Sequence, residues 1–104
     1  MATEKSITKQ IMRYLDSLPD AWFFKTHGGG FGKSGLPDII GHYRGQFYAF
    51  EIKRPKFGKL SALQARAIGE INVSGRKSNL GYSLAHVVTS RDDVEAILTI
   101  PGSM

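Results

Sequence analysis

Two carboxylates and a lysine in the first half of the chain are of the types that bind a divalent metal and cut phosphodiesters. Asp38 follows Pro37, and Glu51 opens the later run Glu51-Ile52-Lys53. On a β-strand, residues two apart point to the same face, so Glu51 and Lys53 would lie side by side. Carboxylates are ligands that Mg²⁺ prefers, and a neighbouring lysine can stabilise developing negative charge. These residues therefore predict a metal-dependent site for phosphate chemistry.

The turn between the two acidic segments determines how close the carboxylates come. If Arg44 and Gly45 are the central residues of a two-residue turn, an antiparallel hairpin places Asp38 directly opposite Glu51. Opposed residues have Cβ atoms roughly 4.5–5.5 Å apart, and like charges at that separation destabilise a sheet. A divalent cation would remove this repulsion, which gives the arrangement a chemical reason.

The pattern of apolar residues predicts the elements that must position this site. We expect helices over residues 3–18, 61–74 and 90–98, strands over 21–27, 36–43, 46–53 and 83–89, a glycine-rich loop at 28–35, and basic loops at 54–60 and 75–81. The strand at 46–53 starts with apolar residues on both faces, so it should be covered on both sides. The order α-β-β-β-α-β-α implies an α/β fold with a mixed four-stranded sheet flanked by helices.

Composition limits the possible classes of protein. At 104 residues the chain is expected to be one domain, spanning 1–104, and its 41% hydrophobic content fits a folded globule. A formal net charge of +5 favours an anionic partner, with nucleic acid ahead of an acidic membrane surface. The absence of cysteine excludes thiolate metal sites, and no apolar run is long enough to span a bilayer. We therefore expect a soluble, cytoplasmic protein that does not associate with membranes.

The glycine-rich segment before Asp38 has some features of a phosphate-binding P-loop. That pattern requires a glycine five positions before Gly32, where this chain has His27. A helix should also follow, yet the run Gly35-Leu36-Pro37 is more typical of an extended segment. We therefore expect a loop near the metal site in which Lys33 and backbone N–H groups contact DNA phosphates.

Three polar residues near the predicted site each have two interpretations. Gln64 can form a capping box with Ser61, and it can also turn toward the site to hold DNA or the attacking water. Glu4 suits the positive end of the first helix, and it can also serve as a further metal ligand. His27 is either a structural hydrogen-bonding residue or a general base or phosphate contact.

Further basic residues are candidates for contacts with the DNA backbone. Several follow the strand that carries Glu51, where a solvated loop is the alternative interpretation. Contacts of this kind would give a strong dependence of binding on salt. The complete set of DNA-binding candidates is His27, Lys33, Arg54, Lys56, Lys59, Arg76 and Lys77.

The acidic pair, the lysine and their flanking segments resemble the PD-(D/E)XK nuclease superfamily. Within it, the chain is similar to the stand-alone VRR-NUC domain, the virus-type replication and repair nuclease of phages and bacteria. The resemblance is carried by Glu4 and by residues 25–28, 35–38, 45–47, 50–55, 60–64 and 87–94. One departure follows Gly75, where the family often has a Gly-Gly pair leading into the last strand. Here residues 76–81 form a longer basic segment, a departure that concerns local DNA contacts and any dimer surface there.

The resemblance implies a restriction-endonuclease-like core and a deoxyribonuclease that uses Mg²⁺, with Mn²⁺ as a substitute. Our hypothesis is that Asp38, Glu51 and the backbone carbonyl of Ile52 bind the metal, with Lys53 and Gln64 assisting the reaction. Similar stand-alone domains act as homodimers on branched DNA. The expected function is therefore structure-specific endonuclease activity of the Holliday-junction-resolvase type, in DNA repair.

Two other functions stay open at this point. The chain could be a basic DNA-binding or assembly module without catalysis, although such a module gains nothing from opposed carboxylates near a phosphate. It could also be a restriction-type endonuclease acting on duplex DNA, although the chain is short for a separate recognition element.

Overall fold

The computed structural model describes residues 2–26, 35–56, 58–76 and 84–99 of the chain. The elements in chain order are α1 (Glu4–Asp16), β1 (Ala21–Lys25), β2 (Ile39–Tyr43), β3 (Gln46–Ile52), α2 (Ala62–Arg76), β4 (Ala85–Val88) and α3 (Arg91–Thr99). They confirm the predicted α/β fold with the order α-β-β-β-α-β-α. Among the described residues, none of the helices combines the length and apolar character needed to cross a bilayer.

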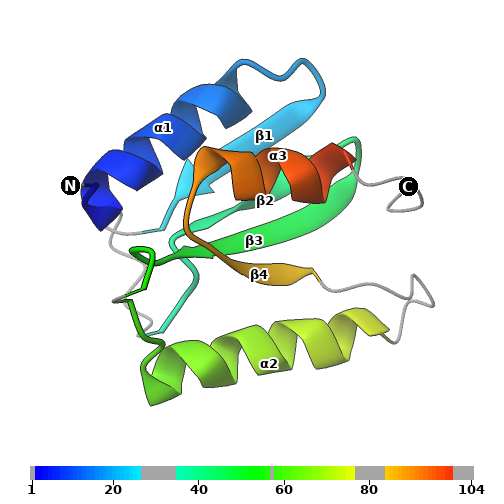
Figure 1. Ribbon diagram of the computed structural model, residues 1–104. Helices are drawn as coiled ribbons and strands as arrows, with labels where there is room; N and C mark the ends of the chain where they lie inside the picture. The colour runs from blue at the N-terminus through cyan, green and yellow to red at the C-terminus, as the bar shows by residue number, and fades with distance from the viewer. Residues whose placement is uncertain (1, 27–34, 57, 77–83, 100–104) are drawn as a thin grey trace.

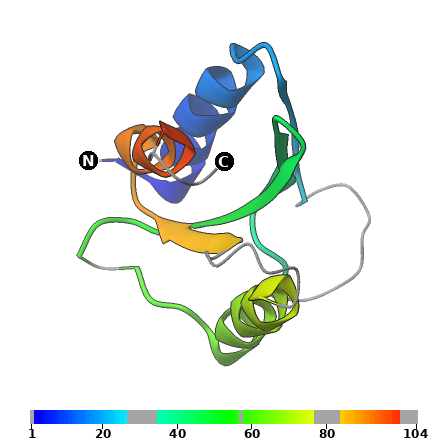
Figure 2. The same ribbon diagram turned by 90° about the vertical axis from the view of Figure 1, so that its right-hand side faces the viewer.

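The four strands form one mixed sheet between two layers of helices (Figure 1). The strand order is β1-β2-β3-β4, in which β1, β2 and β3 are antiparallel neighbours and β4 runs parallel to β3. Seen along the sheet in Figure 2, α1 and α3 lie on one side of it and α2 on the other. The parallel pairing requires a crossover, and α2 provides it between β3 and β4.

The apolar core lies between the sheet and the helix pair α1 and α3. Ile7, Ile11 and Leu15 form one stripe of α1, as their spacing predicts, and they are buried in the same cluster as Phe50 of β3 and Val94 of α3. The consecutive residues 48–52 of β3 are all buried, which confirms that this strand is covered on both sides. The body of β3 is therefore fixed by packing before its charged end is reached.

The β2–β3 hairpin has the predicted two-residue turn and the predicted register. Arg44 and Gly45 have φ angles of 53° and 80°, the left-handed values that a type I′ turn requires at both central positions. Tyr43 pairs with Gln46, and the ladder continues to Ile39 opposite Phe50. The next pair along this ladder is Asp38 and Glu51, so the turn brings the two carboxylates together.

The outer edge of β4 is closed by side chains from the helices that flank it. The carbonyls of Leu84 and Val88 accept hydrogen bonds from β3, so the backbone groups of Ala85 point outward. Asn72 of α2 binds both of these groups, accepting from the N–H at 2.7 Å and donating to the carbonyl at 3.2 Å. At the other end, the N–H of Thr89 donates to Asp93 of α3 at 2.8 Å.

Several predicted boundaries were wrong by a few residues. β2 begins at Ile39 instead of residue 36, because Pro37 has no N–H for the ladder and the Asp38 side chain takes over its last bond. β1 ends at Lys25, and β4 is shorter at both ends than expected. α2 continues past Gly75, which is buried against Leu84: a Cβ added there would lie within 2.4 Å of the Leu84 side chain.

Candidate metal centre

Asp38 is held in place by the two strands on either side of it. Its Oδ2 accepts a hydrogen bond of 2.8 Å from the N–H of Ile52 on β3, although β2 has not yet begun. On the other side, the N–H of Thr26 donates to the Asp38 carbonyl at 2.9 Å, and the buried Thr26 hydroxyl donates to the Pro37 carbonyl at 2.6 Å. The Asp38 carboxylate is therefore fixed at the point where the three antiparallel strands end together.

The segment leading into Asp38 lies directly against the first turn of α2. Gly35 has a φ of 84°, and a Cβ added to it would lie 2.7 Å from the backbone oxygen of Leu63. A side chain at this position would strain the backbone and would push the segment away from the helix. The approach therefore depends on glycine, and it brings α2 close to the acidic pair.

Glu51 is almost fully buried, with 1% of its surface exposed, at the end of β3. Its Oε2 accepts a hydrogen bond of 3.0 Å from the Gln64 side chain and lies 3.6 Å from Nζ of Lys53. Its Oε1 is buried without a hydrogen-bond donor among the described residues. Buried polar atoms are nearly always satisfied, so an orphaned carboxylate oxygen indicates a group that binds there.

The surroundings of Glu51 raise the pKa of its carboxyl from an ordinary 4.5 to about 8. Burial is the largest cause, followed by the negative charge of Asp38 and by a hydrogen bond between the two carboxyls. Lys53 acts in the opposite direction but is outweighed. The two acids are therefore close enough to share a proton, and a divalent cation could take the place of that proton.

Gln64 forms the predicted capping box and also turns toward the acidic pair. In the capping box, the backbone N–H of Gln64 donates to the Ser61 hydroxyl at 3.1 Å. In return, the N–H of Ser61 donates to the side-chain oxygen of Gln64 at 2.9 Å. The same carboxamide donates from Nε2 to Glu51. Helix capping and contact with the acidic pair are thus combined in a single side chain.

Lys53 follows β3 and is held on the same side as Glu51. Its side chain is 12% exposed, and its N–H donates to the Val88 carbonyl at 3.0 Å, which continues the parallel ladder by one bond. The ammonium group is thus at the border between the buried Glu51 carboxylate and solvent. From there it can reach a negatively charged group that approaches Glu51.

The donor atoms at this end of β3 suit a hard divalent cation such as Mg²⁺. Asp38 and Glu51 supply carboxylate oxygens, and the N–H and C=O of Ile52 point toward the same neighbouring strand, which places its carbonyl on the Asp38 side. No group of three metal-binding side chains occurs within the described ranges. The structure therefore does not bring Glu4, which is exposed at the start of α1, into one cluster with both acids.

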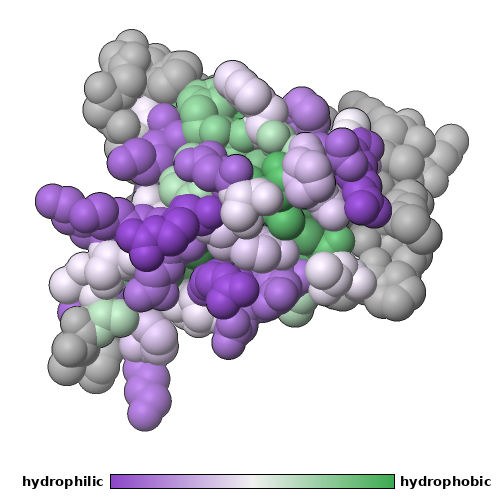
Figure 3. Space-filling model, turned by 90° about the horizontal axis from the view of Figure 1, so that it is seen from above, coloured by the Kyte–Doolittle hydropathy of each residue, from purple (hydrophilic) through white to green (hydrophobic). Residues whose placement is uncertain are grey.

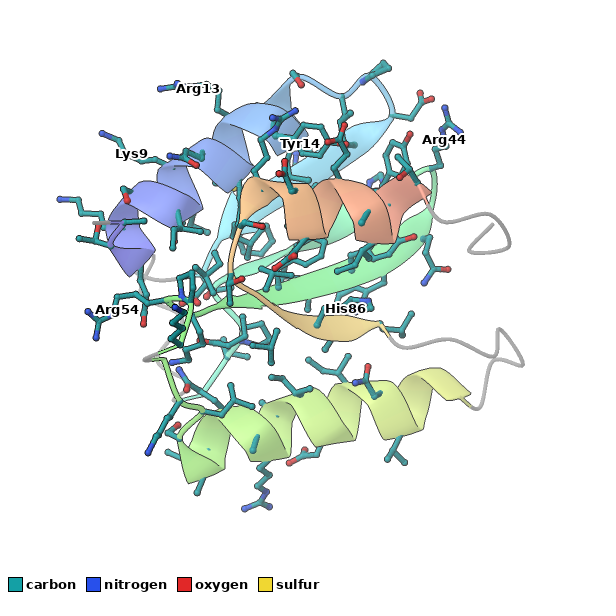
Figure 4. All side chains as sticks on the ribbon, viewed as in Figure 1. Lys9, Arg13, Tyr14, Arg44, Arg54 and His86 are labelled. Carbon is teal, nitrogen blue, oxygen red and sulfur yellow. The ribbon has the colours of Figure 1, made fainter. Side chains whose placement is uncertain are left out.

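Three of the predicted DNA contacts lie on the described part of the segment after β3. Arg54, Lys56 and Lys59 are exposed, and Arg54 projects at the end of the molecule where β3 finishes, opposite the end that carries Arg44 (Figure 4). Hydrophilic residues cover that same end in Figure 3, at its left. The remaining candidates, His27, Lys33, Lys77 and the Arg76 side chain, lie outside the described residues.

Some residues near the acidic pair were given no role in the site from the sequence. Thr26 is one, because a threonine in a strand is unremarkable until its hydroxyl is seen to bind the Pro37 carbonyl. Lys5, Lys9 and Lys25 are others, and they line a cavity together with Asp38. The helical spacing of Lys5 and Lys9 was the available signal, since residues four apart share a face of a helix.

The comparisons with known proteins add no identification to this geometry. No family model matches the chain, and no curated protein or solved structure matches it either.

Proposed function

We propose that this protein is a metal-dependent endonuclease that hydrolyses phosphodiester bonds in DNA. The observation that carries the proposal is the buried carboxylate of Glu51 beside the half-buried Asp38, with one Glu51 oxygen that has no hydrogen-bond donor among the described residues. Burying one carboxylate next to a second one destabilises a fold, and a cation with oxygen ligands would relieve that cost. Such a pair beside a lysine is the arrangement expected for phosphodiester hydrolysis.

Each residue of the pair's surroundings has a role in this proposal. Asp38, Glu51 and the Ile52 carbonyl would hold Mg²⁺ or Mn²⁺, which when bound would polarise the scissile phosphate and lower the pKa of a water molecule. Lys53 would offset the charge that builds up on the phosphate in the transition state. Gln64 keeps Glu51 oriented through its hydrogen bond and could also orient the attacking water.

DNA is the substrate that the charge of the molecule supports. The net charge is +5, and exposed basic residues follow β3 directly after the acidic pair. The preference for branched DNA and the homodimer rest on the resemblance to VRR-NUC domains. A physical argument agrees with the dimer: one site cuts one strand, so paired symmetric cuts need two copies, most simply related by a two-fold axis.

The test is a cleavage assay with a four-way junction and a linear duplex, each with Mg²⁺ or Mn²⁺. We expect the wild type to nick the junction, Asp38→Asn and Lys53→Ala to be slower by about 100-fold or more, and the exposed control Asp16→Asn to match the wild type. Equal preference for the duplex would instead support the restriction-type alternative.

Two results would count against the proposal. A wild type that binds junctions without nicking them in either metal would leave a non-catalytic DNA-binding module. Variants that cut as fast as the wild type would show that the site lies elsewhere. The dimer is tested separately by light scattering with and without DNA, and a monomer under both conditions would exclude it.

A further inference from the structure

A second feature adjoins the acidic pair on the side of α1. A cavity of about 250 Å³ is lined by Lys5, Thr8, Lys9, Lys25 and Asp38. The first three come from the N-terminal half of α1, whereas Lys25 is the last residue of β1. Elements distant in the sequence thus bring three ammonium groups around one hollow, and Asp38 belongs to both this hollow and the candidate metal centre.

The three lysines around the cavity outnumber the one acidic residue that lines it, Asp38. Some other cations of the described chain pair with carboxylates, such as Arg66 with Glu70 at 3.0 Å and Arg91 with Glu95 at 3.8 Å. No ion pair joins Lys5, Lys9 or Lys25 to a carboxylate within the described ranges. Three like charges around one cavity repel one another, so an anion that enters it would be bound favourably.

The placement of these lysines follows from the fold and not from chance exposure. Lys5 and Lys9 are one helical turn apart on α1, so they share a face. Lys25 pairs with Ile39, the residue directly after Asp38, so both side chains point to the same side of the sheet. This is the side covered by α1, because the buried Ile39 side chain belongs to the cluster that includes α1 residues. Lys9 and Arg54 lie at the same end of the molecule (Figure 4).

We propose that this cavity binds a phosphate group of the DNA strand, distinct from the phosphate that is hydrolysed. The volume is below the roughly 300–1,000 Å³ of pockets that enclose a whole drug-sized ligand, so it suits one charged group of a larger molecule. Lysine binds phosphate as a point charge without a fixed geometry, which fits three flexible side chains around one anion. The inference deepens the proposed function, because the bound strand would then pass Asp38 between the lysines of α1 and β1 and the basic segment after β3.

The experiment measures DNA binding without cleavage, by fluorescence anisotropy of a labelled four-way junction in EDTA over a series of salt concentrations. The test variant is Lys5→Gln, Lys9→Gln and Lys25→Gln combined. The control, Arg13→Gln, Arg66→Gln and Arg91→Gln, removes the same charge from α1, α2 and α3 away from the cavity. A second test variant replaces the same three lysines with arginine, and thermal melting verifies that all variants are folded.

We expect the glutamine variant to bind roughly tenfold more weakly at moderate salt. The slope of log affinity against log salt should fall by about 0.9, the contribution of one phosphate contact on duplex DNA. The control should keep the wild-type slope, and the arginine variant should restore most of the affinity. Equal affinities and slopes for the glutamine variant and the control would overturn the proposal.

A second arm distinguishes the two sources of the phosphate. Short oligonucleotides with and without a terminal phosphate are compared on the wild type and the glutamine variant. A preference of the wild type for the phosphorylated end, lost in the variant, assigns the cavity to a terminal phosphate. Weaker binding of the variant to both oligonucleotides, without such a preference, assigns it to an internal phosphodiester. Because no arm requires cleavage, failure of this site and failure of the nuclease proposal are separate results.

Discussion

The β2–β3 hairpin carries one ion pair at each end, and the two pairs differ in almost everything except distance. At the turn, Arg44 lies 3.7 Å from Asp20, and their side chains are 62% and 65% exposed. At the open end, Lys53 lies 3.6 Å from Glu51, and their side chains are 12% and 1% exposed. Exposed pairs contribute little to stability, whereas burying a charge is costly and is retained where it serves another purpose.

Ion pairs of similar length at the two ends of one hairpin therefore differ in what they contribute to the protein. The pair at the turn is an ordinary surface contact beside a well-formed turn. The pair at the open end has an additional carboxylate, Asp38, and an oxygen without a donor in the described structure, so its charges are not arranged for stability. A variant at the open end should therefore gain stability and lose activity, whereas a variant at the turn should lose a little stability and keep its activity.

The largest effect is expected from Glu51→Gln. This substitution replaces a carboxyl that must either bind a proton or carry a buried negative charge, and we expect DNA cleavage to fall by about 100-fold or more while the metal-free protein becomes more stable by about 1–3 kcal/mol at neutral pH. Mg²⁺ should raise the melting temperature of the wild type but not of the variant, because a ligand stabilises the state that binds it. Calorimetry with and without Mg²⁺ checks this, and a variant less stable than the wild type would contradict it.

In the absence of metal, the pH dependence of the free energy of unfolding should reflect the titration of the Glu51 carboxyl. Since the pKa of Glu51 is raised from 4.5 to about 8, the folded protein keeps a proton that the unfolded chain has released between these values. Its contribution to stability is fully present below about pH 4.5 and is lost as the pH rises through about 8. The stability gained by Glu51→Gln over wild type should therefore grow from pH 5 to pH 9, as measured by urea denaturation. The exposed control Glu70→Gln should give a constant difference.

Gln64 allows the capping and site contacts at the open end to be separated. Gln64→Glu retains an acceptor for the Ser61 N–H but replaces the donor to Glu51 with a second negative charge, whereas Gln64→Ala removes both contacts. We expect both variants to lose roughly tenfold or more of the cleavage rate. The side-chain half of the capping box should be lost in the alanine variant alone, at a cost of about 1 kcal/mol, while the bond from the backbone N–H of residue 64 to the Ser61 hydroxyl remains. Cleavage at the wild-type rate in both would limit Gln64 to capping.

The smallest effect is expected at the turn, from Asp20→Asn. The exposed pair with Arg44 is lost, but the Asp20 carbonyl still accepts from the Arg44 N–H at 2.8 Å. Stability should fall by no more than about 1 kcal/mol, and the cleavage rate should not change. A large loss of activity would mean that the two ends of the hairpin are coupled more strongly than their ion pairs indicate.

The elements and the acidic pair could be predicted because they depend on short-range patterns. A two-residue turn at Arg44-Gly45 determines the register, and the register determines that Asp38 meets Glu51. The early start predicted for β2 was wrong because a side chain, not the backbone, completes the ladder at Ile52. The periodicity of apolar residues carries no information about a side chain that replaces the backbone as a hydrogen-bond acceptor.

The cavity beside Asp38 could not be predicted because it depends on how α1 packs against β1. The spacing of Lys5 and Lys9 shows that they share a helix face, but not what that face meets. Lys25 joins them only because β1 pairs with β2 in a register that ends near Asp38. The position of Thr26 behind Pro37 follows from the same pairing, and no local pattern identifies it.

The capped edge of β4 has a consequence for how copies of this protein can aggregate. Adding a strand there would first require breaking the hydrogen bonds of Asn72 to Ala85 and of Asp93 to Thr89. Val87, which is 45% exposed, lies between these two occupied positions, so an incoming chain would meet a very short stretch of open backbone. The side chains of two helices thus hinder edge-to-edge pairing of sheets at β4, and this effect does not depend on the acidic pair.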